Sequence, residues 1–154
     1  MARRVFFSFH REDDIWRANQ VRNVNVVAGS HLTGFFDQSE YEAAKKTGKD
    51  GIQRMILNHL KDTTVTVVLI GTKTAHRRWV KYEIGQSIAR KNGLLGIYIH
   101  RLKDCNKLAC PRGAKPAVPQ GVDFLAYDWD KDLDRFRKEI EAAGKRADAL
   151  RAGQ

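Results

Sequence analysis

VTVVLI, residues 65–70, decides the fold, because this stretch is β-branched and almost entirely apolar. Such a run is typical of a central parallel strand that is covered on both faces, and Gly71 and Thr72 end it. Shorter apolar runs lie on both sides of it along the chain. They predict four further strands, at VFFSF (5–9), TGFF (33–36), LLGIYI (94–99) and residues 124–127.

Helical patterns separate the predicted strands. Three acidic residues at 12–14 favour the start of the first helix. A later helix is expected to be capped by Thr74 and to stop at Asn92-Gly93, and the last is expected over 130–143, with a frayed tail after Gly144. Residues 37–48 are polar and predict a mobile loop. The expected core-facing residues of the first two helices are Ile15, Trp16, Ala18, Val21, Ile52, Met55, Ile56 and Leu60.

This alternation predicts a three-layer α/β fold of the flavodoxin-like type, with a five-stranded, mostly parallel sheet in the order 2-1-3-4-5. The length of 154 residues indicates a single domain over 1–154, with a core at about 4–143. In such sheets the ligand crevice lies beyond the carboxyl ends of strands 1 and 3. We therefore expect it at Ser8-Phe9-His10-Arg11, at Gly71-Thr72-Lys73 and at the start of the helix after strand 3.

Composition limits the class of protein. The chain has 28 Lys and Arg against 18 Asp and Glu, a formal charge of +10, which suggests acidic partners. The basic residues are scattered, so nucleic acid is not the expected partner. No apolar run is long enough to span a membrane or to form a signal peptide, which predicts a cytoplasmic protein without a membrane partner. Cys105 and Cys110 are expected to be reduced thiols, and no metal site is predicted.

Familiar phosphate-binding motifs are missing from the predicted crevice. Strand 3 ends in Gly71-Thr72-Lys73, without the aspartate that a phospho-receiver needs. No GxGxxG motif follows strand 1, and Gly48-Lys49 is followed by Asp50, which excludes a P-loop. Phe9 and His10 stand where a flavin-phosphate loop would need hydroxyls and glycines.

A different pair of residues lies near the crevice. Trp79 and Glu83 are four residues apart, so they share one face of a helix. A carboxylate beside an indole could bind a ribose and stack an aromatic ring. The alternative is that Trp79 belongs to the core and that Glu83 pairs with Arg90 or Lys91. Spacing alone leaves both interpretations open.

Several of these stretches resemble one family. VFFSFH (5–10), DIWRANQVRN (14–23), TVVLIG (66–71), RWVKYEI (78–84) and GLLGIYIH (93–100) are together similar to the TIR-like proteins of the Thoeris antiphage system, of the ThsB type. The resemblance covers about residues 4–104 and, more loosely, 123–143. It does not extend to the loop at 105–120.

The resemblance implies a TIR fold and an enzyme that takes NAD as its substrate, without a cofactor. Such an enzyme breaks the nicotinamide–ribose bond and makes a cyclic ADP-ribose-type messenger, or an ADP-ribose conjugate, that activates a separate effector protein. A phage-derived trigger of the enzyme is also expected as a partner, as is a second copy of the protein through self-association. By the same resemblance Glu83 is the catalytic residue, and the substrate-binding residues are Ser8, Phe9, His10, Asp14, Phe36, Trp79 and Tyr82.

Two other functions stay open from the sequence. Many TIR domains are non-catalytic modules that bind nucleotides or proteins through the same surfaces. A nucleic-acid-binding accessory protein could use the charge of +10. Loss of NAD in stoichiometric amounts would separate the enzyme from both.

Overall fold

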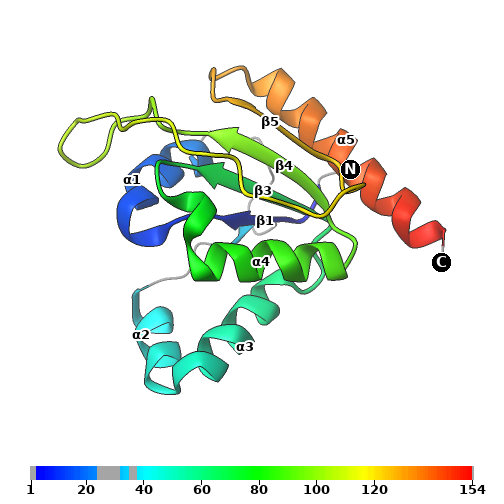
Figure 1. Cartoon of the computed structure of the whole chain (residues 1–154), viewed down its shortest axis with the longest axis horizontal. Helices are drawn as coiled ribbons and strands as arrows, with labels where there is room; N and C mark the ends of the chain where they lie inside the picture. Colours follow the sequence, from blue (N-terminus) through cyan, green and yellow to red (C-terminus); the bar gives the residue numbers. More distant parts are fainter. Residues whose placement is uncertain (1–2, 24–31, 35–37, 154) are drawn as a thin grey trace.

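The fold is a parallel sheet between two layers of helices (Figure 1). A computed structural model describes residues 3–23, 32–34 and 38–153. The strands there are β1 (Val5–Ser8), β2 (Leu32–Thr33), β3 (Val65–Ile70), β4 (Gly93–Tyr98) and β5 (Phe124–Asp128). The helices there are α1 (Arg11–Arg22), α2 (Gln38–Lys46), α3 (Gly48–Leu60), the 3-10 turn η2 (Thr74–His76), α4 (Arg78–Ala89) and α5 (Leu133–Ala152). None of these helices is both long and apolar enough to cross a membrane.

All strand pairings in the sheet are parallel, and the order is β2-β1-β3-β4-β5. The predicted α/β class and strand order are therefore confirmed. Strand β1 pairs with β2 on one side and with β3 on the other, so the order reverses at β1. The crevice expected at this reversal lies at the carboxyl ends of β1 and β3.

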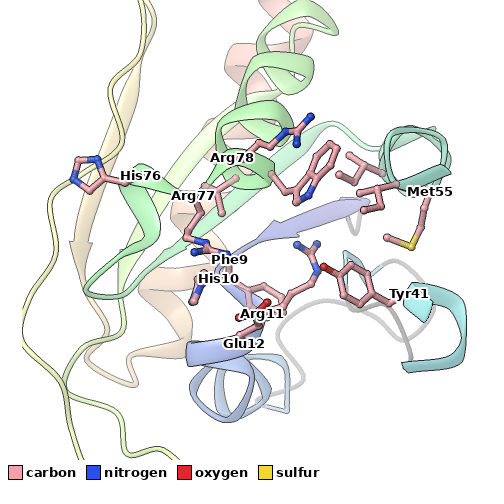
Figure 2. A pocket seen from close by; sticks show the side chains of 13 residues that line it. Phe9, His10, Arg11, Glu12, Tyr41, Met55, His76, Arg77 and Arg78 are labelled. Atoms are coloured by element: carbon pink, nitrogen blue, oxygen red, sulfur yellow. The ribbon is translucent and has the colours of Figure 1, made fainter. Parts of the chain in front are cut away.

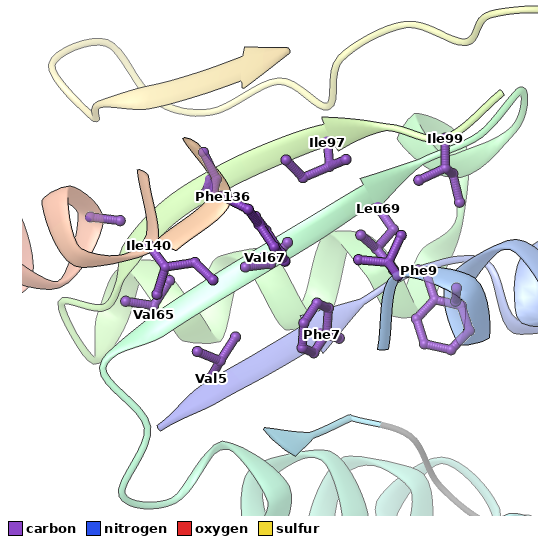
Figure 3. Close-up of a cluster of buried hydrophobic side chains, with 14 of the residues drawn as sticks. Val5, Phe7, Phe9, Val65, Val67, Leu69, Ile97, Ile99, Phe136 and Ile140 are labelled. Carbon is purple, nitrogen blue, oxygen red and sulfur yellow. The ribbon is translucent and has the colours of Figure 1, made fainter. Parts of the chain in front are cut away.

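The alternating side chains of β3 reach both helical layers. Val65, Val67 and Leu69 pack with α1 and α5, in a cluster that also holds Phe7, Ile97 and Phe136 (Figure 3). Val68 and Ile70 pack on the opposite face against α4. All six residues of the strand are buried, as predicted for a central strand. Burial of each such aliphatic side chain contributes about 1.5–3 kcal/mol.

The predicted core face of α1 was partly wrong. Ala18 and Val21 are buried and Ile15 packs against the core, but Trp16 is 58% exposed. Arg17 is buried instead, because its guanidinium is fully occupied: Nη1 donates to the Asp14 carboxylate at 2.9 Å, and the other nitrogens donate to two backbone carbonyls. A pattern of apolar residues could not indicate a buried arginine that is satisfied in this way.

The loop predicted at residues 37–48 is also wrong. Residues 38–46 form α2, and α3 begins at Gly48 after the Thr47 turn. Alanine, glutamate and lysine have high helix propensity, and the α2 sequence QSEYEAAKK contains two of each. Most of α2 is exposed, so the helix has too few apolar residues to show a clear helical period. The sequence therefore suggested a loop.

The expected fraying after Gly144 does not occur, since α5 continues to Ala152. Gly144 and Ala147 are buried on the inner side of the helix. Arg3 fixes the same segment through ion pairs with Glu141 at 2.9 Å and Asp148 at 3.0 Å. A Cβ on Gly144 would lie 2.3 Å from Nε of Arg3, so the glycine leaves room for this clamp.

Close packing of α5 on β4 gives a stability prediction at Gly93. A Cβ there would lie 1.9 Å from the backbone oxygen of Ala143, so Gly93→Ala is expected to lower the free energy of unfolding by about 1–3 kcal/mol. The matched control is Gly85→Ala on α4, where a Cβ meets no atom of the described residues within 4 Å. That variant should gain about 0.5–1 kcal/mol, because glycine weakens a helix interior. Urea unfolding measures both, and equal stability of the two variants would contradict the packing.

Candidate active site

A cavity of about 370 Å³ opens at the carboxyl end of β1 and beside the start of α4, in part of the region where the sequence predicted the crevice (Figure 2). The residues after β1 and the start of α4 form most of its wall, and α2 and α3 close the remaining side. Gly71, Thr72 and Lys73, which were expected there, do not line it. The lining residues are Phe9, His10, Arg11, Glu12, Tyr41, Ile52, Met55, Ile56, His76, Arg77, Arg78, Trp79 and Val80.

Glu83 lies behind this wall and is completely buried. Ser8 Oγ donates a hydrogen bond to Oε1 of Glu83 at 2.7 Å. Arg11 Nη2 donates to Oε2 at 2.8 Å, as part of an ion pair. Both carboxylate oxygens are therefore held by groups at the end of β1 and the start of α1. The alternative pairing of Glu83 with Arg90 or Lys91 is wrong.

The electrostatics of Glu83 follow from its burial. Removal from water raises the pKa of the carboxyl above its ordinary value, whereas the positive charge of Arg11 and the hydrogen bonds from Ser8 and Arg11 act in the opposite direction. The ionised form thus depends on Arg11. A carboxylate in such a dry position interacts strongly with any positive charge or hydroxyl that reaches it.

Trp79 lies one helical turn before Glu83 on the same helix, as the spacing predicted, and it lines the cavity. The guanidinium carbon of Arg78 lies 4.7 Å from the centre of its ring. Tyr82 meets the same indole edge-on, with ring centres 5.7 Å apart, and both rings pack against the cluster around Phe6. Tyr82 is not among the lining residues, so the structure makes it a support for Trp79 rather than a wall of the cavity.

Phe9 and His10 both line the cavity, as expected. His10 Nδ1 accepts a hydrogen bond from the Asp13 N–H at 3.2 Å and so caps α1. Burial is the main reason that the pKa of His10 lies below its ordinary value; Asp13 opposes this shift and Arg77 adds to it. The ring is therefore neutral near pH 7, with its proton on Nε2, because Nδ1 acts as an acceptor.

Of the predicted substrate-binding residues that the structure describes, Ser8, Asp14 and Tyr82 do not line the cavity. Asp14 is buried against Arg17, and its carboxylate lies where a Cβ on Gly71 would be, so it joins α1 to the end of β3. Burial raises the pKa of this carboxyl, with Arg17 opposing the shift. Asp14 is thus a structural residue in this conformation. Phe36 lies outside the described residues.

Some lining residues were missed by sequence reasoning. Tyr41 lies on α2, in the stretch that predicted a loop, and Ile52 and Met55 were expected only to face the core. Arg11 was placed in the crevice, but nothing in the sequence paired it with Glu83, which lies 72 residues further along the chain. The available signal was that a positively charged residue, Arg11, lies in the same predicted crevice segment as Ser8.

Comparisons with known proteins identify the family of this chain. Residues 6–104 match the family model described as Thoeris protein ThsB, TIR-like domain. Over 134 residues the chain is 43% identical to a Bacillus cereus (strain MSX-D12) protein named "Putative cyclic ADP-D-ribose synthase ThsB1". That alignment covers 86% of this chain and 67% of the relative. The chain therefore belongs to the ThsB family of Thoeris TIR-like domain proteins.

Proposed function

We propose that the protein cleaves NAD at the nicotinamide–ribose bond and forms a cyclic ADP-ribose-type messenger for antiphage signalling. The observation that carries this proposal is the buried carboxylate of Glu83, held by Ser8 and Arg11 directly behind a cavity that Trp79 lines. The name of the Bacillus cereus relative supports the same activity. A separate effector protein would bind the messenger.

One carboxylate is sufficient for this chemistry. The bond between C1′ of the ribose and N1 of the nicotinamide breaks, and its electron pair neutralises the pyridinium nitrogen, so the leaving group needs no proton. Positive charge then develops on the ribose. The negative charge of Glu83 stabilises it electrostatically. Capture of C1′ by an atom of the adenosine half closes the ring and releases one proton, whereas capture by water gives ADP-ribose.

Arg11 has to move for Glu83 to meet the ribose. Its guanidinium covers Oε2 and itself lines the cavity, with 18% of the side chain exposed. Ribose hydroxyls are donors that could take the place of the Arg11 N–H group on the carboxylate. Exchange of one donor for another keeps the buried oxygen satisfied throughout.

Trp79 supplies an aromatic surface next to this carboxylate. It is partly buried and is held from behind by Tyr82, so its ring orientation is fixed. A nicotinamide or adenine ring stacked on such an indole would be positioned with little loss of entropy. Stacking of the adenine close to C1′ would favour ring closure over hydrolysis, because water would be displaced from that face.

A nucleotide-binding module without turnover is the second candidate. The occupation of both Glu83 oxygens by Ser8 and Arg11 favours it, since this conformation leaves neither oxygen of Glu83 free. The two candidates differ in whether NAD is consumed. Both bind the nucleotide in the same cavity.

The test is NAD consumption by the purified chain, with product masses determined by mass spectrometry, in the presence and absence of lysate from phage-infected cells. Release of nicotinamide with a product of ADP-ribose mass minus water supports cyclisation. A product of ADP-ribose mass indicates hydrolysis, and a heavier one indicates a conjugate. Absence of turnover in both conditions, with nucleotide binding retained, would favour the binding module.

A further inference from the structure

The amino end of α4 opens into the cavity without a side-chain cap. The helix begins at Arg78, and its N-cap residue Arg77 makes no capping hydrogen bond from its side chain. The first turn carries no acidic residue. Thr74, which the sequence predicted as the cap, accepts a hydrogen bond from the Gly71 N–H at 2.8 Å and belongs to η2 instead. The N–H groups of the first turn therefore lack a side-chain cap from Arg77, at a point where Arg77, Arg78 and Trp79 line the cavity.

A second donor belongs to a residue that lines the same cavity. His10 Nε2 is buried, and no acceptor for it exists among the residues that the structure describes. Only 6% of the side chain is exposed, and the ring lines the cavity. A buried N–H group without an acceptor is costly, so its presence in a cavity wall points to a ligand that supplies the acceptor.

The charges on this part of the wall are mainly positive. In Figure 2 the Arg77 side chain extends from the start of α4 toward Phe9 and His10. Arg78 starts from the same turn and lies over Trp79. Glu12 is the one acidic residue among those that line the cavity within the described ranges. A helix N-terminus beside guanidinium groups is an arrangement that binds phosphate.

We propose that the amino end of α4, together with Arg77 and His10, binds the diphosphate of NAD. This inference rests on the proposed function, because it assigns a part of the same substrate to a part of the same cavity. The helix N-terminus and Arg77 supply positive charge, and His10 supplies a neutral N–H donor. Phosphate oxygens accept from all three.

The placement is consistent with the position of Glu83. Arg77 and Glu83 are six residues apart on one helix, so they are separated by about 9 Å along its axis. Trp79 lies between them. The ribose would then lie at Glu83 and the diphosphate at the amino end of α4. Residues of one helix would thus hold both the ribose and the diphosphate. Precise spacing of these two groups is what a cleavage site needs.

ADP-ribose is the probe for this site, because it contains the diphosphate and has no nicotinamide bond to break. Its affinity is measured by calorimetry for wild type, Arg77→Ala and His10→Asn. The asparagine side chain can still cap α1 but lacks the Nε2 donor. Each variant is expected to bind ADP-ribose about tenfold or more weakly. Arg137→Ala on α5, which removes the same charge from an exposed position, should stay within about twofold of wild type.

Unchanged affinity in Arg77→Ala, or no binding of ADP-ribose by the folded wild type, would overturn the assignment. Circular dichroism and melting temperature establish that each variant is folded. The KM for NAD separates this inference from the proposed function. If Arg77→Ala cleaves NAD with an unchanged KM, the diphosphate site is refuted and the proposed enzyme function is retained. If the wild type does not cleave NAD but the variants bind ADP-ribose more weakly than it does, the enzyme function is refuted and the diphosphate site is retained.

Discussion

Glu83→Gln is expected to lower the rate of NAD cleavage by about a thousandfold, because removal of one preorganised electrostatic group from a dry site has effects of this size. The amide has nearly the same shape as the carboxylate and can still accept the hydrogen bond from Ser8 Oγ. What it loses is the negative charge that would face the developing cation on the ribose. The measurement is nicotinamide release under single-turnover conditions.

The matched control is Glu139→Gln on α5, since it makes the same chemical change on the other side of the sheet. Its activity should equal that of wild type. ADP-ribose should still bind to Glu83→Gln, because the diphosphate site proposed at the start of α4 is unchanged. An activity of Glu83→Gln within about tenfold of wild type would show that Glu83 is not the catalytic group, whatever its burial.

The sequence contained most of the information that determines the sheet. The apolar run at residues 65–70 predicted a strand buried on both faces, and every residue of β3 is buried. The rule for parallel sheets then placed the crevice at the ends of β1 and β3, and the cavity lies at the end of β1 without contact to the residues that end β3. Both predictions depend on local hydrophobicity, which a single sequence records directly.

The errors occurred where polar contacts or small residues determine the packing. Arg17 is buried because three carbonyls and Asp14 accept its hydrogen bonds, and Gly144 lets Arg3 approach α5. Neither contact leaves a periodic pattern in the sequence. Thr74 was a reasonable cap by residue type, but the chain first makes a turn of 3-10 helix. Helix boundaries depend on such tertiary contacts as much as on propensity.

The candidate site was predictable only in part, for the same reason. Helical spacing placed Trp79 and Glu83 on one face of α4, and Trp79 lines the cavity while Glu83 lies buried behind its wall. The resemblance to the family assigned further residues one by one, but it could not separate the wall of the cavity from its support. Tyr82 and Asp14 are near the site and serve to hold Trp79 and the end of β3.

Arg11→Met is expected to lower the free energy of unfolding at pH 7 by about 3 kcal/mol, because it leaves a buried carboxylate without its counter-charge. The Arg11 guanidinium is the cation hydrogen-bonded to Glu83, at 2.8 Å. Ser8 still donates to the other oxygen in this variant, so the carboxyl group stays partly satisfied. Urea unfolding at pH 7 gives the magnitude. Arg137→Met on the exposed side of α5 should change it little.

The double variant Arg11→Met/Glu83→Gln separates loss of the ion pair from loss of packing. A neutral amide needs no counter-charge, so the double variant should be more stable than Arg11→Met alone by about 2 kcal/mol. If the two are equally stable, the arginine acts through its contact with Phe9 and its hydrogen bond to Gly34 rather than through charge.

The pH dependence gives an independent check on the same pair. Burial already raises the pKa of Glu83 above its ordinary 4.5, and removal of Arg11 takes away the largest opposing effect, so the pKa rises further. A carboxyl group whose pKa is higher in the folded state favours folding below pH 4.5, and this contribution is lost as the pH increases through the folded-state pKa. The stability deficit of Arg11→Met should therefore shrink from pH 7 toward pH 4.5. A deficit that is constant over this range would mean that Glu83 is not ionised behind the cavity, and the electrostatic role proposed for it in NAD cleavage would fail with it.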